Sequence, residues 1–349
     1  MSATLSVGIL GLNRVGTSIG LALRRYMADG GRYSFDIVGY DRSADAAKGA
    51  VKAEAIDRSE GKPFQVVADK DIVIMALSYD EVRDAYQSIA TDLKEGVVIL
   101  DVSPLKQPSF EWAKTYLSAE HHVIGISPIL NPRYLLDNSQ DGDDAAADLF
   151  DNSAILISPA VSSIKEAVDL AFNFCTILGS KPRFLDPVEH DALLTYTEGV
   201  PKLLGTALFA SLMNKPNWDD LMWLTNPSFG VLTRPLKDQH PDALRDEFFN
   251  NREAMVRALD DIIATLQSWR NLLATRSDNP QDLEDAQESI EAAIVSASEE
   301  YEKWINRRYR ADWDEQPKPK VDPTNTMLGG LLGQGVTKRL FGGKKDQDD

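Results

Sequence analysis

Short apolar runs alternate with helix-like segments along the first half of the chain. The apolar runs cover residues 7–10, 35–40, 72–77, 97–100, 123–126 and 154–157. Between most of them, apolar positions recur with helical spacing. Strands that alternate with helices of about 10–15 residues predict a parallel, doubly wound sheet. We therefore expect an α/β fold in which residues 1–160 form a Rossmann-type, dinucleotide-binding domain.

Beyond residue 160 the pattern is helical, apart from a short extended piece at residues 183–185. Apolar stripes of helical spacing predict an all-helical domain over residues 161–312. Residues 189–213 are broadly apolar, as in a buried helix, and residues 282–312 carry a stripe that would make a helix about 45 Å long. A small monomeric domain could not cover that stripe, so we expect a homodimer formed through the helical domain. The prolines and glycines of residues 313–349 predict a flexible tail.

The first apolar run leads through a glycine-containing turn into a helix. This order is typical of the opening of a dinucleotide-binding unit, in which helix amides meet a pyrophosphate. Asn13 replaces the middle glycine of the usual motif, and asparagine tolerates unusual backbone angles better than most residues. The candidate cofactor-binding residues here are Gly11, Leu12, Asn13, Arg14, Val15 and Gly16.

Two further strand ends should lie beside the same cofactor. Asp41 follows the second apolar run, where a carboxylate can accept hydrogen bonds from an adenosine ribose. Arg42 comes next and could instead meet a 2′-phosphate, so NAD is favoured while NADP stays open. Leu77 and Ser78 end the strand at residues 72–77, and ligands of open α/β sheets bind at such carboxyl ends.

Composition narrows the class of protein. The net charge of −17 argues against nucleic acid as a partner, because both would be negative. No apolar run approaches a membrane span, and the N-terminus lacks the regions of a signal peptide, which predicts a cytoplasmic protein. The single cysteine offers no metal cluster. Residues 137–151 hold six aspartates and no lysine or arginine, which favours a solvated surface loop over a functional lid.

The order of these motifs resembles the prephenate dehydrogenase family, which includes arogenate dehydrogenases. The similar segments are residues 11–18, 38–43, 101–106, 149–159, 189–191 and 229–234. The resemblance spans roughly residues 7–266. It implies hydride transfer to NAD(P) from a carboxylated cyclohexadienyl substrate with loss of carbon dioxide, a step of tyrosine biosynthesis. It also implies that Arg234 binds a substrate carboxylate.

The chain departs from the family pattern in the chemistry. Ser127 stands where the family has the histidine that takes the proton from the ring hydroxyl. The family's partner serine falls on Pro104, with Ser103 one place earlier. A family segment with two histidines falls on residues 198–202, where both are replaced. His190 and Arg234 are what remains of the polar set that the resemblance would supply.

Several residues could take over the lost role. Aromatisation supplies much of the driving force, and a general base contributes about 10²–10⁴-fold. Ser127 could hold the hydroxyl, and Lys202, Glu198 or a desolvated Lys106 could accept the proton. For substrate binding we expect Arg234, His190, Ser103 and Lys106.

Two other functions remain compatible with the sequence. One is a dehydrogenase of the same fold with a different carboxylate substrate, since the polar pocket is rewritten. The other is a non-catalytic dinucleotide-binding sensor or partner subunit. A retained Arg234 favours an enzyme, because a guanidinium suits a carboxylate.

Overall fold

The computed structural model describes residues 3–137, 139–276 and 279–311. One eight-stranded sheet has the order β3-β2-β1-β4-β5-β6-β7-β8. Its strands are β1 (Ala3–Leu10), β2 (Tyr33–Tyr40), β3 (Arg58–Ser59), β4 (Ile72–Met75), β5 (Val98–Asp101), β6 (His122–Ile129), β7 (Ala154–Pro159) and β8 (Lys181–Phe184). The predicted α/β fold with a Rossmann-like sheet and a helical second domain is confirmed. Only the β6–β7 pair among these strands is antiparallel, which the periodicity did not indicate.

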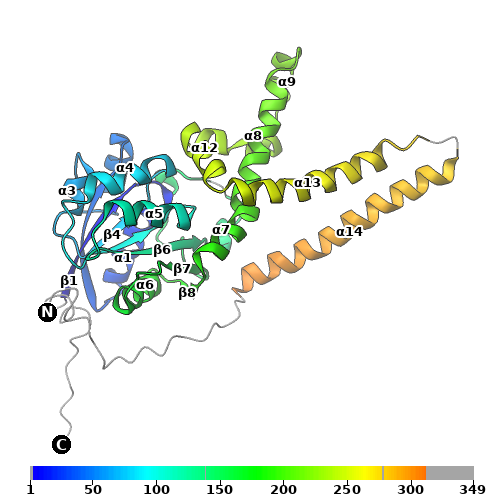
Figure 1. Ribbon diagram of the computed structural model, residues 1–349. Helices are drawn as coiled ribbons and strands as arrows, with labels where there is room; N and C mark the ends of the chain where they lie inside the picture. Colours follow the sequence, from blue (N-terminus) through cyan, green and yellow to red (C-terminus); the bar gives the residue numbers. More distant parts are fainter. Residues whose placement is uncertain (1–2, 138, 277–278, 312–349) are drawn as a thin grey trace, which may run out of the picture.

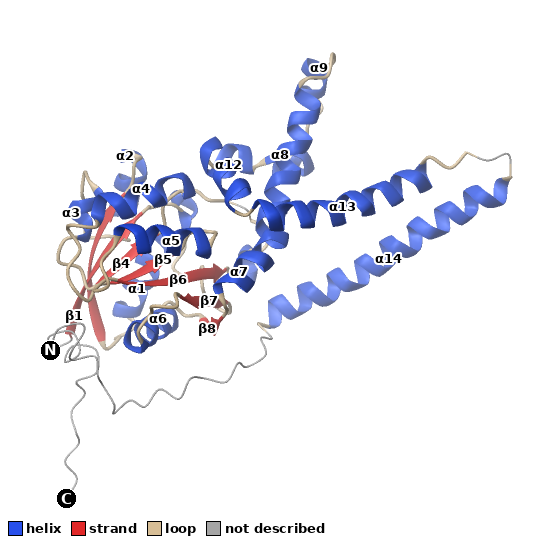
Figure 2. Ribbon diagram, viewed as in Figure 1, coloured by secondary structure: helices blue, strands red, loops and turns tan. Residues whose placement is uncertain are grey.

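Helices cover both faces of the sheet, as Figures 1 and 2 show. One face packs α1 (Arg14–Ala28), α2 (Ala44–Lys52) and α6 (Lys165–Ile177), and the other packs α3 (Pro63–Val67), α4 (Tyr79–Ile89) and α5 (Lys106–Tyr116). The period of two along each strand builds these two cores. In β4, Ile72 and Ile74 face the first core, and Val73 and Met75 face the second.

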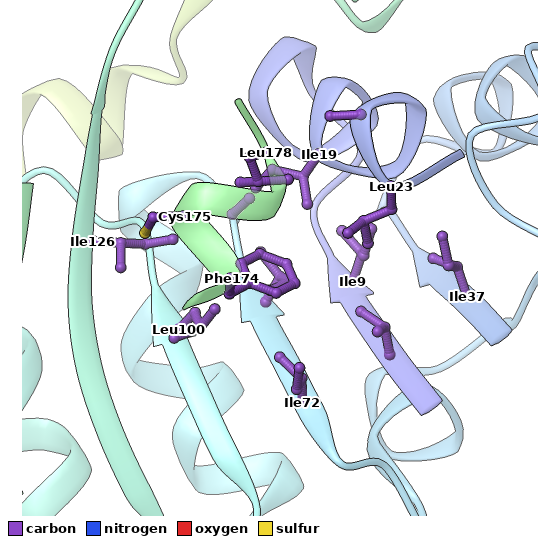
Figure 3. Packing of buried hydrophobic residues seen from close by; sticks show 14 of the residues in the cluster. Ile9, Ile19, Leu23, Ile37, Ile72, Leu100, Ile126, Phe174, Cys175 and Leu178 are labelled. Carbon is purple, nitrogen blue, oxygen red and sulfur yellow. The ribbon is translucent and has the colours of Figure 1, made fainter. Parts of the chain in front are cut away.

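The first core extends beyond the expected domain boundary at residue 160. Figure 3 shows Phe174 and Leu178, at the end of α6, among the residues of the sheet's core. β8 pairs with β7 through Ala154–Lys181 and three further positions. The extended piece expected within the helical domain is therefore the eighth strand of the sheet. Residue 160 falls between elements that share one core.

The remaining described residues are helical. They form α7 (Pro187–Leu194), a π-helical turn η3 (Thr195–Gly199), α8 (Val200–Met213), α9 (Trp218–Trp223), α10 (Pro227–Thr233), α11 (Pro235–Asp238), α12 (Pro241–Asn250), α13 (Arg252–Leu273) and α14 (Pro280–Arg310). The single helix expected over residues 189–213 is interrupted at η3. Pro201 has no amide hydrogen to continue the α-helical pattern, which explains the wider turn before it.

The last two helices form an arm that extends away from the sheet (Figure 1). α14 contains 31 residues, of which Ala286 is buried. Leu283, Ile294 and Tyr301 of the predicted apolar stripe are about half exposed in the single chain, at 49%, 48% and 51%. The expected long helix is present, and its apolar stripe lies open. The expected tail, residues 313–349, lies wholly outside the described residues.

Candidate active site

A serine, a histidine and an aspartate form a chain of hydrogen bonds where the two domains meet. Ser127 lies near the end of β6, and its Oγ is 2.7 Å from Nε2 of His190 in α7. His190 Nδ1 lies 2.8 Å from Oδ1 of Asp191. His190 and Asp191 are buried, whereas Ser127 is partly exposed. Ser127 is therefore the member of this chain that lies nearest to solvent, and the imidazole lies behind it.

The start of α5 holds the aspartate of this chain. The amides of Lys106 and Gln107 donate to the two carboxylate oxygens of Asp191 at 2.8 and 2.9 Å. These amides are free in the first turn of a helix, where the macrodipole also favours a negative charge. Asp191 thus joins the helical domain to the sheet domain and fixes the position of His190.

Lys106 lies beneath the same cluster with its side chain fully buried. Its Nζ donates to the carbonyl oxygens of Asp101, Ser103 and Ile126 at 2.9, 2.7 and 2.9 Å. Three acceptors require three N–H donors, so the side chain is an ammonium group. Burial lowers the pKa of Lys106 to about 8, while Asp101 and Asp191 oppose that shift. No N–H remains for a substrate, contrary to the expected contact.

The residues around Lys106 and Ser103 explain where these two side chains lie. A side chain at Gly125 would come within 2.8 Å of Lys106 Cδ, so the glycine leaves room for the lysine to pass β6. Ser103 is also buried; its amide donates to Asp101 at 2.7 Å and its hydroxyl to the Leu105 carbonyl at 3.3 Å. Ser103 therefore stabilises the turn before α5, and its hydroxyl does not face the open side of the site.

The imidazole of His190 is held in its neutral form. Desolvation lowers the pKa of His190, the hydrogen bond to Asp191 raises it, and the Lys106 ammonium lowers it again. The net shift is downward from the ordinary value. Near neutral pH, Nδ1–H donates to Asp191 and Nε2 accepts the hydroxyl hydrogen of Ser127.

The glycine turn lies at the carboxyl end of β1. Gly11 has φ +91°, a conformation that favours glycine. Asn13 caps α1: its Oδ1 accepts from the amides of Val15 and Gly16, both at 3.0 Å. Its Nδ2 donates to the Ala76 carbonyl at 2.8 Å, which ties the turn to the end of β4. The asparagine thus takes the place that an anion would occupy at these amides.

The acidic loop docks on this turn. The Arg14 amide donates to the Gln140 carbonyl at 3.0 Å. The Arg14 guanidinium is buried and donates to the carbonyls of Ser139 and Asp144, both at 3.1 Å, and to the Asp137 carboxylate at 2.9 Å. Four of the six aspartates are exposed, as expected of a surface loop, while Asp148 and Asp151 are half-buried and pair with Arg133 and Arg25. The backbone of the loop covers the first turn of α1. The amides of Arg14, Val15 and Gly16 consequently all have partners within the chain.

The second strand end carries Asp41 and Arg42. Asp41 accepts from the Leu12 amide at 2.8 Å and from the Ser43 amide at 2.7 Å, so it braces the turn and keeps lone pairs for a ribose. Arg42 donates to Asp80 at 3.2 Å and lies 3.8 Å from Glu81. Its charge is therefore already matched by carboxylates of α4. Leu77 and Ser78 lie between β4 and α4, because the strand expected to run to Leu77 ends at Met75.

Arg234 lies in the helical domain. Its Nε donates to Asp238 at 2.7 Å, one helical turn further on. The guanidinium faces a groove of about 780 Å³ between α8, α10 and α11. Apolar side chains of this groove include Phe209, Met213 and Val231. The structure pairs Arg234 within its own segment rather than with the Ser127 cluster.

Glu198 lies in η3, and Lys202 lies one turn further along, at the start of α8. Lys202 Nζ lies 2.9 Å from Glu247 in a largely buried ion pair. Glu198 is exposed in the single chain. Desolvation raises the pKa of its carboxyl, Lys202 lowers it and Glu247 raises it, and the net shift is upward. Neither side chain is hydrogen-bonded to Ser127 in the described residues.

Sequence reasoning did not single out Asp191 as a functional residue. A usable signal existed: Asp186 before Pro187 is a typical helix start, and it places His190 and Asp191 in the first turns of α7. What the sequence could not indicate is that α7 would meet the first turn of α5. The role of Gln140 had no signal, because its backbone carbonyl makes the contact.

Comparison with known proteins defines the class. The sequence profile for the nucleotide-binding domain of prephenate dehydrogenase matches residues 19–182. The profile for the dimerization domain of the same enzyme matches residues 186–303. Together they cover most of the chain. The chain belongs to the prephenate dehydrogenase family, and its two domains are the family's nucleotide-binding and dimerization domains.

Solved structures share the fold at low sequence identity. A prephenate dehydrogenase from Aquifex aeolicus, in complex with hydroxyphenyl propionate and NAD+, has a TM-score of 0.68 at 20% identity, over 84% of this chain and 98% of that one. A Synechocystis arogenate dehydrogenase has a TM-score of 0.58 at 18% identity, over 84% of this chain and 99% of that one. A putative prephenate dehydrogenase from Corynebacterium glutamicum has a TM-score of 0.56 at 18% identity, over 89% of this chain and 98% of that one. Comparison with curated proteins gives no match.

Within the described residues, no helix is long and apolar enough to cross a membrane. Nor does that part of the chain bring together three or more His, Cys, Asp or Glu side chains that could hold a metal ion.

Proposed function

We propose that this chain is an NAD-dependent dehydrogenase that oxidises and decarboxylates a carboxylated cyclohexadienyl substrate such as prephenate or arogenate. The observation that carries the proposal is the contact between Ser127 and His190. Ser127 stands where the family resemblance expects the proton-accepting histidine, and a buried, neutral imidazole lies 2.7 Å behind its hydroxyl. The lost histidine therefore has a replacement within reach of the same substrate oxygen.

NAD, when bound, supplies the acceptor for the hydride. The residues that would hold it are those of the turn from Gly11 to Gly16, together with Asp41, Leu77 and Ser78. The turn and Asp41 fit this role, because the strand, the left-handed glycine and the ribose-side carboxylate are all in place. NAD is preferred over NADP because Asp80 and Glu81 neutralise Arg42 and would repel a 2′-phosphate.

A homodimer and a carboxylate contact complete the proposal. The exposed apolar stripe of α14 and the family's dimerization domain support packing of two copies through their helical domains. Light scattering should then return twice the chain mass of 38.6 kDa. Arg234 would bind the substrate carboxylate by exchanging its Asp238 partner, and Arg234→Ala should raise KM more than it lowers kcat.

The test is direct. The purified protein is mixed with NAD+ and either prephenate or arogenate, and the formation of NADH is followed by absorbance. We expect turnover of one of the two, and Ser127→His should increase it if the base limits the rate. Turnover of a different cyclic carboxylate alone would support the same fold and cofactor with another substrate. No NADH from any of these would contradict the proposal.

One observation favours a second function, that of a non-catalytic dinucleotide-binding sensor or partner. The acidic loop accepts from the Arg14 amide and Asn13 accepts from the amides of Val15 and Gly16, so groups of the chain itself occupy the amides that a pyrophosphate would use. In that case the binding of NADH would be coupled to loop movement, and no substrate would be turned over. Binding of NADH without turnover by wild type or by Ser127→His would favour the sensor.

A further inference from the structure

Resting on the proposed reaction, we infer that Ser127, His190 and Asp191 form a proton relay. Ser127 is the catalytic residue that touches the substrate hydroxyl, His190 is the final proton acceptor, and Asp191 is a positioning residue. The inference rests on the two contacts that join them, 2.7 Å from Ser127 Oγ to His190 Nε2 and 2.8 Å from His190 Nδ1 to Asp191 Oδ1.

The direction of the relay follows from the partners of Asp191. Its two oxygens already accept from the amides of Lys106 and Gln107. A carboxylate held in this way can only accept from His190, so the proton of the neutral imidazole sits on Nδ1. Nε2 must then accept from the Ser127 hydroxyl. The free lone pairs of Ser127 Oγ remain available to accept a hydrogen bond from a substrate hydroxyl on the open side.

The proton balance of the proposed reaction fits this arrangement. As hydride leaves the carbinol carbon for NAD+, the hydroxyl proton passes to Ser127 Oγ, and the serine's own proton passes to His190 Nε2. The ring carbon then loses its carboxylate as carbon dioxide, and the electron pair of the broken carbon–carbon bond makes the ring aromatic. The resulting phenolate oxygen takes the proton back through Ser127. The relay therefore accepts one proton from the substrate hydroxyl and returns it to the phenolate oxygen in each turnover.

The surrounding charges suit a temporary acceptor. Asp191 stabilises an imidazolium at His190, whereas the Lys106 ammonium opposes it, and Asp101 lies close enough to favour it. The buried imidazole consequently accepts a proton in the reaction but does not hold one at rest. Lys106 and Lys202 are poorer acceptors, since Lys106 Nζ donates to three carbonyls and Lys202 is paired with Glu247.

The relay predicts the direction of the pH dependence. It needs neutral His190, so activity should be present above the pKa of that residue and fall as pH drops through it. Burial places that pKa below 6.5, so the acid limb of kcat should lie below this value. Asp191→Asn removes the negative charge and replaces one acceptor oxygen by an NH2 donor, so the side chain no longer fixes the tautomer of His190. It should therefore lower kcat with little change in KM.

The activity test uses matched serines. Ser127→Ala should lower kcat about 10²–10⁴-fold, and Ser127→Thr, which keeps a hydroxyl, should restore much of it. Ser158→Ala is the control, because this buried serine on the neighbouring strand β7 has no hydrogen-bond partner in the described residues. Equal activity of Ser127→Ala and wild type would overturn the relay.

A second readout does not depend on turnover. The chain has four histidines, so nitrogen-15 NMR of labelled protein can identify His190 by comparison with His190→Gln. We expect a neutral imidazole protonated at Nδ1, a changed Nε2 shift in Ser127→Ala, and a mixed tautomer in Asp191→Asn. A proton on Nε2 in wild type would overturn the relay. If the NMR result is as expected but no substrate is oxidised, the proposed function fails and the hydrogen-bond chain stands.

Discussion

The β6 side and the β1 side of the sheet both present the first turn of a helix to the site, yet these turns are used differently. At α5, the amides of Lys106 and Gln107 bind the carboxylate of Asp191, which is buried. At α1, the amide of Arg14 binds a backbone carbonyl of an exposed loop. The first arrangement joins two domains around an imidazole. In the second, a surface loop covers the start of the helix and is held there by the buried Arg14 guanidinium.

The comparison shows how one structural device serves two purposes. Free amides at a helix start need acceptors. Where the acceptor is a buried carboxylate from another domain, removing it costs folding free energy, and the carboxylate fixes the relative position of the two domains. Where the acceptor is a loop carbonyl, an incoming phosphate can replace it. The substrate side is therefore organised in advance, and the cofactor side must open before the turn can bind a pyrophosphate.

The largest effect should come from removing the fixed anchor. Asp191→Ala leaves two helix amides and the imidazole Nδ1–H without their buried acceptor, so the free energy of unfolding should fall by about 3–5 kcal/mol. Urea unfolding at constant protein concentration measures it. Asp45→Ala is the control, since that side chain is 95% exposed and lies 3.6 Å from Lys48; we expect no measurable change. If Asp191→Ala lowered the free energy of unfolding no more than Asp45→Ala, the view that Asp191 joins the two domains would be wrong.

The next largest effect should come from displacing the acidic loop from the first turn of α1. A Cβ at Gly142 would lie 2.7 Å from the Leu12 carbonyl oxygen, so Gly142→Ala should push the loop off the turn while Arg14 stays intact. If the loop competes with the dinucleotide, the Kd for NADH should fall about tenfold, equivalent to about 1.4 kcal/mol. Fluorescence titration measures it.

Gly61→Ala serves as the control for that experiment, because nothing lies within 4 Å of a Cβ added there. Its Kd should match the wild type. An unchanged Kd in Gly142→Ala would mean that the loop does not compete with NADH. A weaker Kd would mean that the docked loop is itself part of the dinucleotide site.

The same comparison explains what the sequence could predict. The strands, the glycine turn and the long helix α14 follow from periodicity and local turn chemistry, which act within a few residues. The dual role of Asp191 depends on α7 meeting α5, and 84 positions separate it from Gln107 along the chain. The cover depends on a backbone carbonyl at Gln140, and no side-chain pattern encodes that contact. Composition predicted a solvated surface loop, but it did not indicate that the backbone of this loop docks on the first turn of α1.

The smallest effect concerns the choice of cofactor at the rim of the covered side. Asp80 accepts from Arg42 at 3.2 Å, so Asp80→Asn leaves the guanidinium with Glu81 as its nearest carboxylate, at 3.8 Å. A 2′-phosphate could then pair with Arg42. Because Arg42 and a 2′-phosphate would form a partly exposed ion pair, the gain in binding free energy for NADPH should be about 0.5–1 kcal/mol, or a twofold to fivefold lower Kd.

The Kd for NADH should not change, because Asp41 still faces the ribose. Asp84→Asn removes the same charge from an exposed position of the same helix and should alter neither constant, which separates a local contact with Arg42 from a general change in net charge. Parallel titrations of wild type and both variants with NADH and NADPH measure the change in each Kd for each variant. If Asp80→Asn weakens NADH as much as it strengthens NADPH, the carboxylate supports the turn as a whole. If neither constant moves, Arg42 does not face the 2′ position, and the preference for NAD must come from Asp41 alone.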